Sequence, residues 1–347
     1  MTAAPVKIAV LGAGLIGRRH IEHILAAPEA ALHSIVDPSP AARDYALAHD
    51  FPWHPDFKTM LAAGRPDALI AATPTRLHVP DGLAAVAAGI PALIEKPLAD
   101  DLTAGTRLVE AAEKAGVPLL VGHHRRHNPM VRRAREIITS GRLGRIVTVH
   151  SFFWTMKPDD YFDIAWRREA GAGPVLTNLI HDIDLLRHFC GEIESVQAAQ
   201  SNMVRGHGVE ETAVAILKFV SGALGTVNVS DTVVAPWNWE QTAGENPAYP
   251  RTDQSCYNIA GTHGSLCVPR LELWTNGTER GWLQPLRTER LTAPDQDPLR
   301  LQIEHFCRVA RGKEKPLVSG REGLKTLQVI VAVKQAAAGG ASVRIEP

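Results

Sequence analysis

A glycine-rich turn near the start of the chain has the spacing of a phosphate-binding site. It matches the pattern GxGxxG, follows an apolar run that predicts a strand, and opens a predicted helix. With 28 glycines in 347 residues, chance alone gives about 0.2 matches per chain, so the flanking strand and helix make the match informative. The backbone of such a turn approaches a pyrophosphate closely, and the helix start offers unpaired N–H groups. We therefore expect these residues to bind a dinucleotide: Gly12, Ala13, Gly14, Leu15, Ile16 and Gly17.

An acidic residue after the second predicted strand favours NAD over NADP as that dinucleotide. Asp37 follows the strand predicted over residues 32–36 and lies twenty positions after Gly17, where a carboxylate accepts a hydrogen bond from the ribose 2′-hydroxyl. The same carboxylate would repel the 2′-phosphate of NADP, and no arginine follows it directly. The alternative is a glycine turn with an incidental aspartate, which the agreement of turn, helix and acidic residue disfavours.

The first third of the chain alternates predicted strands and helices. Short apolar runs that stop at Gly, Pro or Asp predict strands, and stretches rich in Ala and Leu predict helices. The strands are expected over residues 7–11, 32–36, 67–71, 90–94 and 118–121, and the helices over 15–27, 41–49, 81–88 and 103–115. This alternation predicts βαβ units on a parallel sheet, so we expect an α/β dinucleotide-binding Rossmann domain over residues 1–122.

The pattern changes after Gly122. Strands are expected over residues 145–153, 195–203, 211–219 and 222–229, with helices over 129–139, 175–189 and about 320–338. Strands that follow one another without helices indicate a mostly antiparallel sheet, so residues 123–347 are expected to form a second α/β domain that binds substrate. The segment 231–253, with Trp237 and Trp239, is expected to be a long ordered loop or a lid.

Composition excludes several classes of protein. Lys+Arg and Asp+Glu both number 37, so no net field collects nucleic acid or an anionic membrane. The 4 cysteines are scattered without a CxxC pair, which disfavours a zinc site and a disulfide framework and fits a reducing compartment. Neither a signal peptide nor an apolar run long enough for a membrane span is visible. We expect a cytoplasmic protein that has no metal site.

Ordered motifs along the whole chain resemble the Gfo/Idh/MocA family of glucose–fructose oxidoreductases and inositol dehydrogenases. They are GAGLIGRRH near the start, VDPSP after the second strand, EKP at residues 95–97 with AxTPxxxH before it, GHHRRHNP at 122–129, the segment 171–191, and GTHGSL at 261–266. The resemblance implies a Rossmann domain followed by an α/β domain with a large open sheet. In the family this sheet is commonly an oligomer interface, so a homodimer or homotetramer is expected.

The EKP motif lies where the family places its proton-transfer lysine. This implies a catalytic role for Lys96, which follows a predicted parallel strand at the edge where open α/β sheets bind ligands. The alternative for a lone lysine is a solvated side chain at a strand end. By the same resemblance, further cofactor contacts are expected from Thr73, Pro74, His78, Glu95, Lys96, Trp166 and Arg167.

The helix predicted over residues 175–189 resembles the family segment that carries a catalytic histidine. The resemblance implies that role for His181, but the family's carboxylate four residues earlier is Thr177 here. A threonine can bond a substrate hydroxyl but cannot balance the charge of an imidazolium. Asp182 or Asp184 is a candidate for that charge, and Asn178 is a candidate for a sugar hydroxyl. We therefore expect Thr177, Asn178 and Asp182 to contact substrate.

The basic run His123–His127 allows two interpretations: a solvated hinge between domains, or a segment that partly faces cofactor or substrate. Arg126 matches an arginine of the family motif and could pair with a substrate carboxylate, so it is expected to bind substrate.

These residues predict hydride transfer between NAD and a secondary hydroxyl of a cyclic polyol or sugar. Two alternatives stay open: an NAD-dependent glycosidase that oxidises its sugar transiently, and a non-catalytic NAD-binding sensor, against which Lys96 and His181 argue. Thr177 argues against myo-inositol itself as the substrate.

Overall fold

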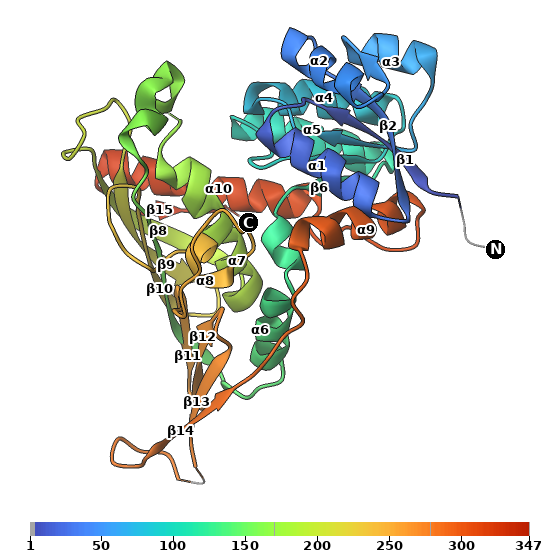
Figure 1. Cartoon of the computed structure of the whole chain (residues 1–347). Coiled ribbons are helices and arrows are strands. Elements are labelled where there is room, and N and C mark those ends of the chain that lie inside the picture. The colour runs from blue at the N-terminus through green and yellow to red at the C-terminus, as the bar shows by residue number, and fades with distance from the viewer. Residues whose placement is uncertain (1–3, 170, 278, 347) are drawn as a thin grey trace. The chain divides into compact units, whose positions relative to one another are not determined.

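A computed structural model describes residues 4–169, 171–277 and 279–346 (Figure 1). It divides into two compact units, the first made of Met1–His127 and Gln296–Leu327, and the second of Asn128–Asp295 and Gln328–Pro347. The chain thus leaves the first unit after His127 rather than after residue 122, and Gln296–Leu327 returns to it. The return has a physical cause, because helix α9 (Pro298–Ala310) buries Ile303 and Phe306 in the first unit's core.

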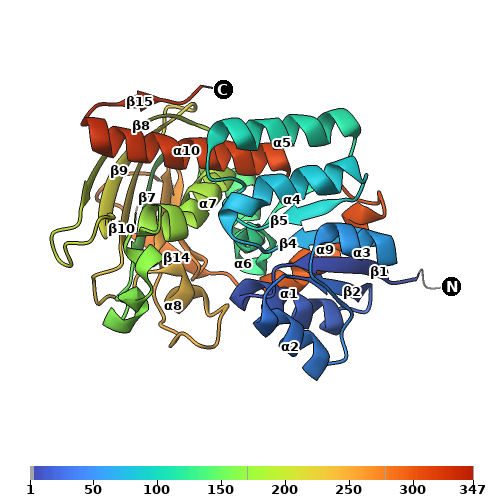
Figure 2. The same cartoon turned by 90° about the horizontal axis from the view of Figure 1, so that it is seen from above.

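The first unit is built on a parallel sheet. Its six strands lie in the order β3 (Trp53–His54), β2 (Ala30–Val36), β1 (Val6–Leu11), β4 (Ala68–Ala71), β5 (Ala92–Ile94) and β6 (Leu119–Val121). Between them run α1 (Leu15–Ala26), α2 (Pro40–Ala48), α3 (Phe57–Ala63), α4 (Thr75–Ala87) and α5 (Leu102–Ala115). Helices cover both faces, as Figure 2 shows, so the central strands β4 and β5 are buried and apolar throughout, and β1 is buried except at Lys7. The predicted Rossmann fold is confirmed.

The second unit is built on a nine-stranded sheet. The strand order is β14 (Leu286–Arg290), β13 (Glu272–Asn276), β12 (Gly264–Val268), β11 (Tyr257–Gly261), β7 (Ile146–Trp154), β10 (Leu224–Ser230), β9 (Thr212–Phe219), β8 (Ile193–Ser201) and β15 (Val343–Arg344). Neighbouring strands are antiparallel except β7 and β10, which run parallel. The prediction of a mostly antiparallel sheet is confirmed.

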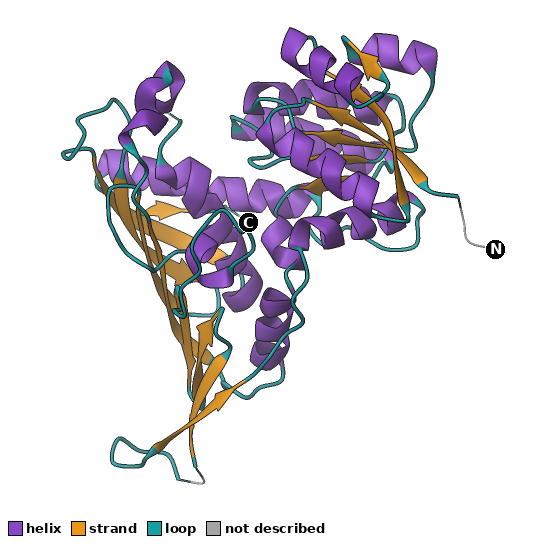
Figure 3. Ribbon diagram, in the orientation of Figure 1, coloured by secondary structure: helices purple, strands orange, loops and turns teal. Residues whose placement is uncertain are grey.

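Helices cover one face of this second sheet (Figure 3). Buried residues of α6 (Pro129–Thr139), α7 (Ile180–Cys190) and the second half of α10 (Gly320–Gly339) join the core residues of the sheet in one cluster. On β9 the side chains alternate between buried and exposed, which is the period-2 pattern of a sheet with one solvated face. The exposed set includes Val214 and Ile216.

Three further sequence predictions differ from the structure. Helix α4 begins at Thr75, ahead of the predicted residue 81, because the fold accommodates Pro80 within the helix. The helix predicted from residue 175 starts with a π-helical turn, Val175–Leu179, before α7. The expected lid contains the short helix α8 (Trp239–Ala243), and Trp239 is fully buried, so this tryptophan anchors the segment to the core.

All four cysteines are free thiols. Among the described residues, no helix combines the length and apolar character that crossing a bilayer requires.

Candidate functional site

The glycine turn has the geometry that close backbone approach requires. Gly12 has φ +85°, and a Cβ there would lie 2.6 Å from the carbonyl oxygen of Ala72. A Cβ at Gly17 would lie 2.0 Å from the carbonyl oxygen of Gly12, so the helix packs directly on the turn. A Cβ at Gly14, by contrast, would meet no atom within 4 Å. The turn is therefore closely packed at its two ends and open at its centre.

The start of α1 is available to an anion. Gly14 is the N-cap residue and provides no side-chain cap for the first turn of the helix, so the N–H groups of that turn are not satisfied by a capping side chain. Such a helix start attracts phosphate through its N–H groups and the positive end of its dipole. These features fit the pyrophosphate of a dinucleotide.

The carboxylate of Asp37 lies against the glycine turn. One oxygen accepts a hydrogen bond from the backbone N–H of Ala13 at 2.9 Å, and the other accepts from the backbone N–H of Ser39 at 2.8 Å. Burial alone would raise the pKa of Asp37, but hydrogen bonds from Ser39 and Ala13 outweigh it and lower the pKa below its ordinary value. A charged acceptor at the end of β2 is what a ribose hydroxyl requires.

Lys96 lies two residues after the end of β5 and is half-buried. The preceding Glu95 is directed into the protein: its Oε1 lies 2.8 Å from Nε2 of His20, and its Oε2 accepts from the backbone N–H of Lys96 at 3.1 Å. Burial would raise the pKa of Glu95, but the hydrogen bond and charge of His20, together with the charges of Lys96 and His124, lower it to about 2. The sequence analysis expected Glu95 to contact the cofactor, but its carboxylate bonds His20 and the backbone of Lys96.

The three other expected cofactor contacts of this unit differ in exposure. Pro74 is exposed and Thr73 is half-buried, with the Thr73 hydroxyl donating to Asp81 at 2.6 Å. His78 is 1% exposed, and its ring nitrogens lie 2.7 Å from the carbonyl oxygen of Pro97 and 2.9 Å from that of Thr73. The imidazole of His78 therefore links the backbone at Thr73 to the backbone at Pro97, and both ring nitrogens point to these carbonyls rather than to a ligand.

The basic run after β6 is largely buried, which is the reverse of a solvated hinge. Residues His124–His127 form a 3₁₀ turn in which Arg125, Arg126 and His127 are buried. The guanidinium of Arg126, the expected partner of a substrate carboxylate, lies 3.3 Å from a carboxylate oxygen of Glu322. The structure thus gives Arg126 an internal counter-ion.

The second unit holds the other expected site residues at the start of α7. The hydroxyl of Thr177 donates to the carbonyl of Gly173 at 3.0 Å and lies 3.0 Å from Oδ1 of Asn178. His181 is 7% exposed and Asp182 is 1% exposed. The Tyr257 hydroxyl of β11 donates to Asp182, so this carboxylate faces the core of the unit, and its expected contact with substrate has no support in the geometry.

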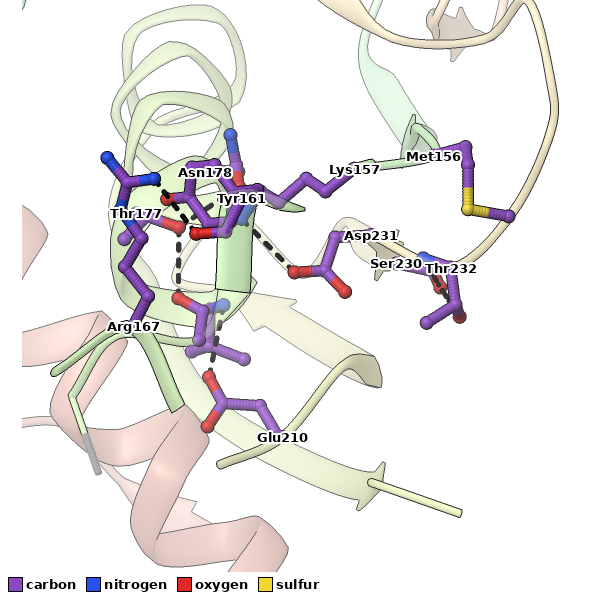
Figure 4. A network of polar contacts seen from close by, with 12 residues as sticks. Met156, Lys157, Tyr161, Arg167, Thr177, Asn178, Glu210, Ser230, Asp231 and Thr232 are labelled. Carbon is purple, nitrogen blue, oxygen red and sulfur yellow. Dashed lines mark hydrogen bonds and ion pairs between the residues drawn. The ribbon is translucent and has the colours of Figure 1, made fainter. Parts of the chain in front are cut away.

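A buried carboxylate that the sequence analysis missed lies beside this turn. Oε1 of Glu210 accepts from the backbone N–H of Val175 at 3.2 Å (Figure 4), and a Cβ at Gly173 would lie 2.2 Å from the same oxygen. Burial raises the pKa of Glu210. Glu210 thus places a titratable group next to the turn that carries Thr177, where the family's carboxylate is absent.

An ion-pair network at the ends of β7 and β10 was also missed. Asp231 lies 3.1 Å from Nζ of Lys157 and 2.7 Å from a guanidinium nitrogen of Arg205; Figure 4 shows the Lys157 contact as a dashed line. Burial lowers the pKa of Lys157, and the Asp231 charge opposes this effect. Lys157 follows β7 and Asp231 follows β10, the two parallel strands. The signal in the sequence that could have predicted this network is a polar residue after each of these strands.

Trp166 and Arg167 lie on a 3₁₀ turn of the second unit. Trp166 is 56% exposed. The Arg167 guanidinium donates to the carbonyl of Tyr161 at 2.9 Å, a hydrogen bond that Figure 4 draws as a dashed line. It also stacks 4.1 Å from the centre of the Tyr161 ring. Stacking of this kind holds a guanidinium in one orientation.

Two stretches of the chain match known families. Residues 6–123 match the family described as "Oxidoreductase family, NAD-binding Rossmann fold". Residues 131–267 match the family described as "GFO/IDH/MocA C-terminal domain". The first stretch contains the glycine turn, Asp37 and Lys96, and the second contains α7 and the ion-pair network.

Individual relatives agree with this assignment. The 1,5-anhydro-D-fructose reductase of Ensifer adhaerens is 30% identical over 288 residues, covering 81% of this chain and 80% of that protein. Inositol 2-dehydrogenase 2 of Saccharopolyspora erythraea is 30% identical over 240 residues, covering 65% of this chain and 66% of that protein. The WlbA dehydrogenase of Bordetella pertussis, solved with NADH and UDP-GlcNAcA, has a TM-score of 0.79 at 27% identity, with 99% of each chain covered. The chain therefore belongs to the Gfo/Idh/MocA family of oxidoreductases and carries that family's NAD-binding Rossmann fold.

Proposed function

We propose that this protein is an NAD-dependent dehydrogenase that acts on a secondary hydroxyl of a cyclic polyol or sugar, or on the matching ketone in the reverse direction. The observation that carries the proposal is the position of Lys96. It follows β5 in the same unit as the open glycine turn, at the carboxyl edge of the parallel sheet, where such sheets bind ligands.

Each group of residues has a defined task in this proposal. The N-terminus of α1 binds the pyrophosphate, and Asp37 bonds the ribose and disfavours a 2′-phosphate. NAD, when bound, supplies the hydride acceptor. Lys96 contacts the substrate oxygen. It accepts the hydroxyl proton when the alcohol is oxidised and returns it when the ketone is reduced, and we propose that His181 shares this proton transfer. Thr177 and Asn178 offer a hydroxyl and an amide for substrate hydroxyl groups.

The relatives support the substrate class. An anhydrosugar reductase and an inositol dehydrogenase are each 30% identical to this chain. Their names share one chemical feature, a ring compound that carries several hydroxyl groups. One relative, at 28% identity, is named as an NADP-dependent D-xylose dehydrogenase, so the preference for NAD rests on Asp37.

The test is NAD reduction, followed by absorbance, against a panel of inositols, aldoses, anhydrosugars and sugar acids. We expect turnover with one class of compound. Lys96→Ala should bind NADH nearly as the wild type does and lose turnover by about 100-fold or more, the usual size of a proton-transfer contribution. Lys58→Ala, which changes an exposed lysine of α3 in the same unit, should retain turnover.

Other outcomes would favour the two alternatives. Release of an aglycone from glycosides without net NADH would identify a glycosidase. Tight NADH binding with no turnover of any compound would identify a sensor. Retention of most turnover in Lys96→Ala would refute the role of Lys96.

We also propose that the protein is a homodimer or homotetramer that associates through the open face of the second sheet. The exposed side chains of Val214, Ile216 and Leu224 on this face support the proposal, because an exposed apolar sheet surface favours association. The expected result is a multiple of the monomer mass by light scattering, which Ile216→Arg reduces to the monomer mass. A monomeric wild type would refute it.

A further inference from the structure

Two buried histidines hold the segment that carries Lys96. His20 comes from α1 and is 0% exposed, and His78 comes from α4 and is 1% exposed. His20 bonds the Glu95 side chain, and His78 bonds the Pro97 backbone. The residues immediately before and after Lys96 are therefore both tied to helices.

On the amino side of Lys96, the tie runs through Glu95. A carboxylate only accepts hydrogen bonds, so Nε2 of His20 carries the proton in its 2.8 Å contact with Oε1 of Glu95. Oε2 of the same carboxylate accepts from the backbone N–H of Lys96 at 3.1 Å. One carboxylate thus joins the α1 side chain to the backbone of Lys96.

On the carboxyl side, His78 lies between two carbonyl oxygens. Its Nδ1 is 2.7 Å from the oxygen of Pro97, and its Nε2 is 2.9 Å from the oxygen of Thr73. The segment after β4 and the segment after β5 are therefore linked through one imidazole. This contact restrains the backbone directly after Lys96.

The Glu95 carboxylate packs directly against the backbone of Gly122. A Cβ at Gly122, just after β6, would lie 2.9 Å from Cδ and from both carboxylate oxygens of Glu95. Among the residues that the structure describes, Nδ1 of His20 has no hydrogen-bond partner. Glu95 is thus the partner of the polar contact that this buried histidine makes, so His20 acts on the Glu95 side chain and does not only fill the core.

We propose that His20 is a positioning residue for the reaction: through Glu95 it fixes the backbone of Lys96 relative to the helix that begins at the glycine turn. The inference rests on the proposed role of Lys96 in catalysis. Because α1 also packs on the turn at Gly17, one helix sets both the turn at its own start and the segment that carries the lysine. His20 itself touches neither substrate nor cofactor in this scheme.

The expected effect follows from the cost of misplacing a catalytic group. A displacement of about 1 Å can lower a rate about 100-fold, and loss of a group that orients a catalytic residue commonly costs about 10- to 100-fold. In His20→Leu we therefore expect kcat to fall about 10- to 100-fold. KM for the sugar and Kd for NADH should change less than about threefold, because His20 contacts neither ligand.

Two variants provide the comparison. His20→Gln places an amide donor near the position of Nε2 and should restore most of kcat. His23→Leu changes a partly buried histidine one turn later on α1, whose Nε2 lies 3.6 Å from Asp297 and not near Glu95. It should leave kcat unchanged. If His20→Leu does not fold, His20→Asn replaces it, because its shorter side chain cannot reach Glu95.

A second readout does not depend on activity. After reductive ¹³C-methylation of the lysines, the resonance that is missing in Lys96→Ala identifies Lys96. We expect this resonance to shift in His20→Leu and to keep its wild-type position in His23→Leu. The measurement uses the full chain without substrate, so it reports on the tie even if the dehydrogenase assignment fails.

The outcomes separate the two proposals. Full turnover in Lys96→Ala refutes the catalytic assignment, whereas a shifted Lys96 resonance in His20→Leu would still support the tie. Wild-type kcat in folded His20→Leu, with Lys96→Ala inactive, overturns the positioning role and leaves the proposed function intact. A lower melting temperature with unchanged kcat would likewise overturn it, since that result indicates a purely structural histidine.

Discussion

Glu95→Gln is expected to remove a pH-dependent part of the stability of the first unit. The change keeps the shape of the side chain and removes its charge. In the wild type, the carboxylate accepts from both His20 and the backbone of Lys96. A glutamine has one accepting oxygen and one donating nitrogen, so it can serve only one of these donors and turns a donor toward the other. A protonated glutamic acid has the same defect.

The magnitude follows from the pKa. The pKa of Glu95 is about 2 in the folded protein, against an ordinary value of 4.5. Each pKa unit corresponds to about 1.36 kcal/mol, so the ionised carboxylate contributes at most about 3 kcal/mol to the free energy of unfolding near neutral pH. Because the folded pKa is lowered, this contribution is complete above the ordinary value and is lost as the pH falls toward 2. About 2 kcal/mol of it should disappear between pH 6 and pH 3.

The assay is urea unfolding of the wild type and the variant at a series of pH values, followed by circular dichroism. We expect the wild type to be more stable at pH 7, and the difference to shrink steadily below pH 5. Glu22→Gln, which changes an exposed carboxylate of α1, serves as the control and should show no comparable loss. A difference between wild type and Glu95→Gln that is absent at pH 7, or that grows on acidification, would show that the ionised Glu95 carboxylate does not stabilise the fold.

Three further variants test individual contacts. Asp37→Ala removes the acceptor that bonds Ala13 and should shift the ratio of kcat/KM values for NAD and NADP toward NADP by about tenfold or more; an unchanged ratio would count against the assignment of NAD. Gly17→Ala places a Cβ 2.0 Å from a backbone oxygen and should lower the free energy of unfolding by about 1–3 kcal/mol in urea. Gly14→Ala should leave the stability unchanged and weaken NADH binding in calorimetry. Equal stability of the two variants would contradict this prediction. Tyr257→Phe removes the donor to buried Asp182 and should lower the free energy of unfolding in urea by about 1–3 kcal/mol. Tyr45→Phe serves as the control. A loss below about 0.5 kcal/mol would show that the contact contributes little.

The elements of the first unit were predictable because their signals are local. An apolar run that ends in a glycine turn, as at Val6–Leu11, predicts a buried parallel strand without knowledge of its neighbours. The same holds for the positive φ of Gly12 and for Asp37 at the end of β2. Strands β11–β14 were missed because they are short and their side chains lack a sustained period-2 pattern.

Contacts between distant residues were not predictable. His20 and Glu95 are 75 positions apart, and Arg205 and Asp231 are 26 apart. The return of α9 to the first core depends on which sheet buries Ile303 and Phe306, and an amphipathic pattern alone does not name the partner surface.

The sequence alone determined the chemical inventory of this protein: a phosphate-binding turn, an acidic residue for the ribose, a lysine at a strand end and a histidine on a helix. Each of these is a matter of residue type, spacing and local conformation. Which polar groups face inward depends on the three-dimensional fold. It buried His78 against two carbonyl oxygens, turned Asp182 toward Tyr257 and joined Lys96 to His20 through Glu95. The physical reason is that a buried polar group requires a partner, and the fold, rather than the local sequence, brings that partner within reach.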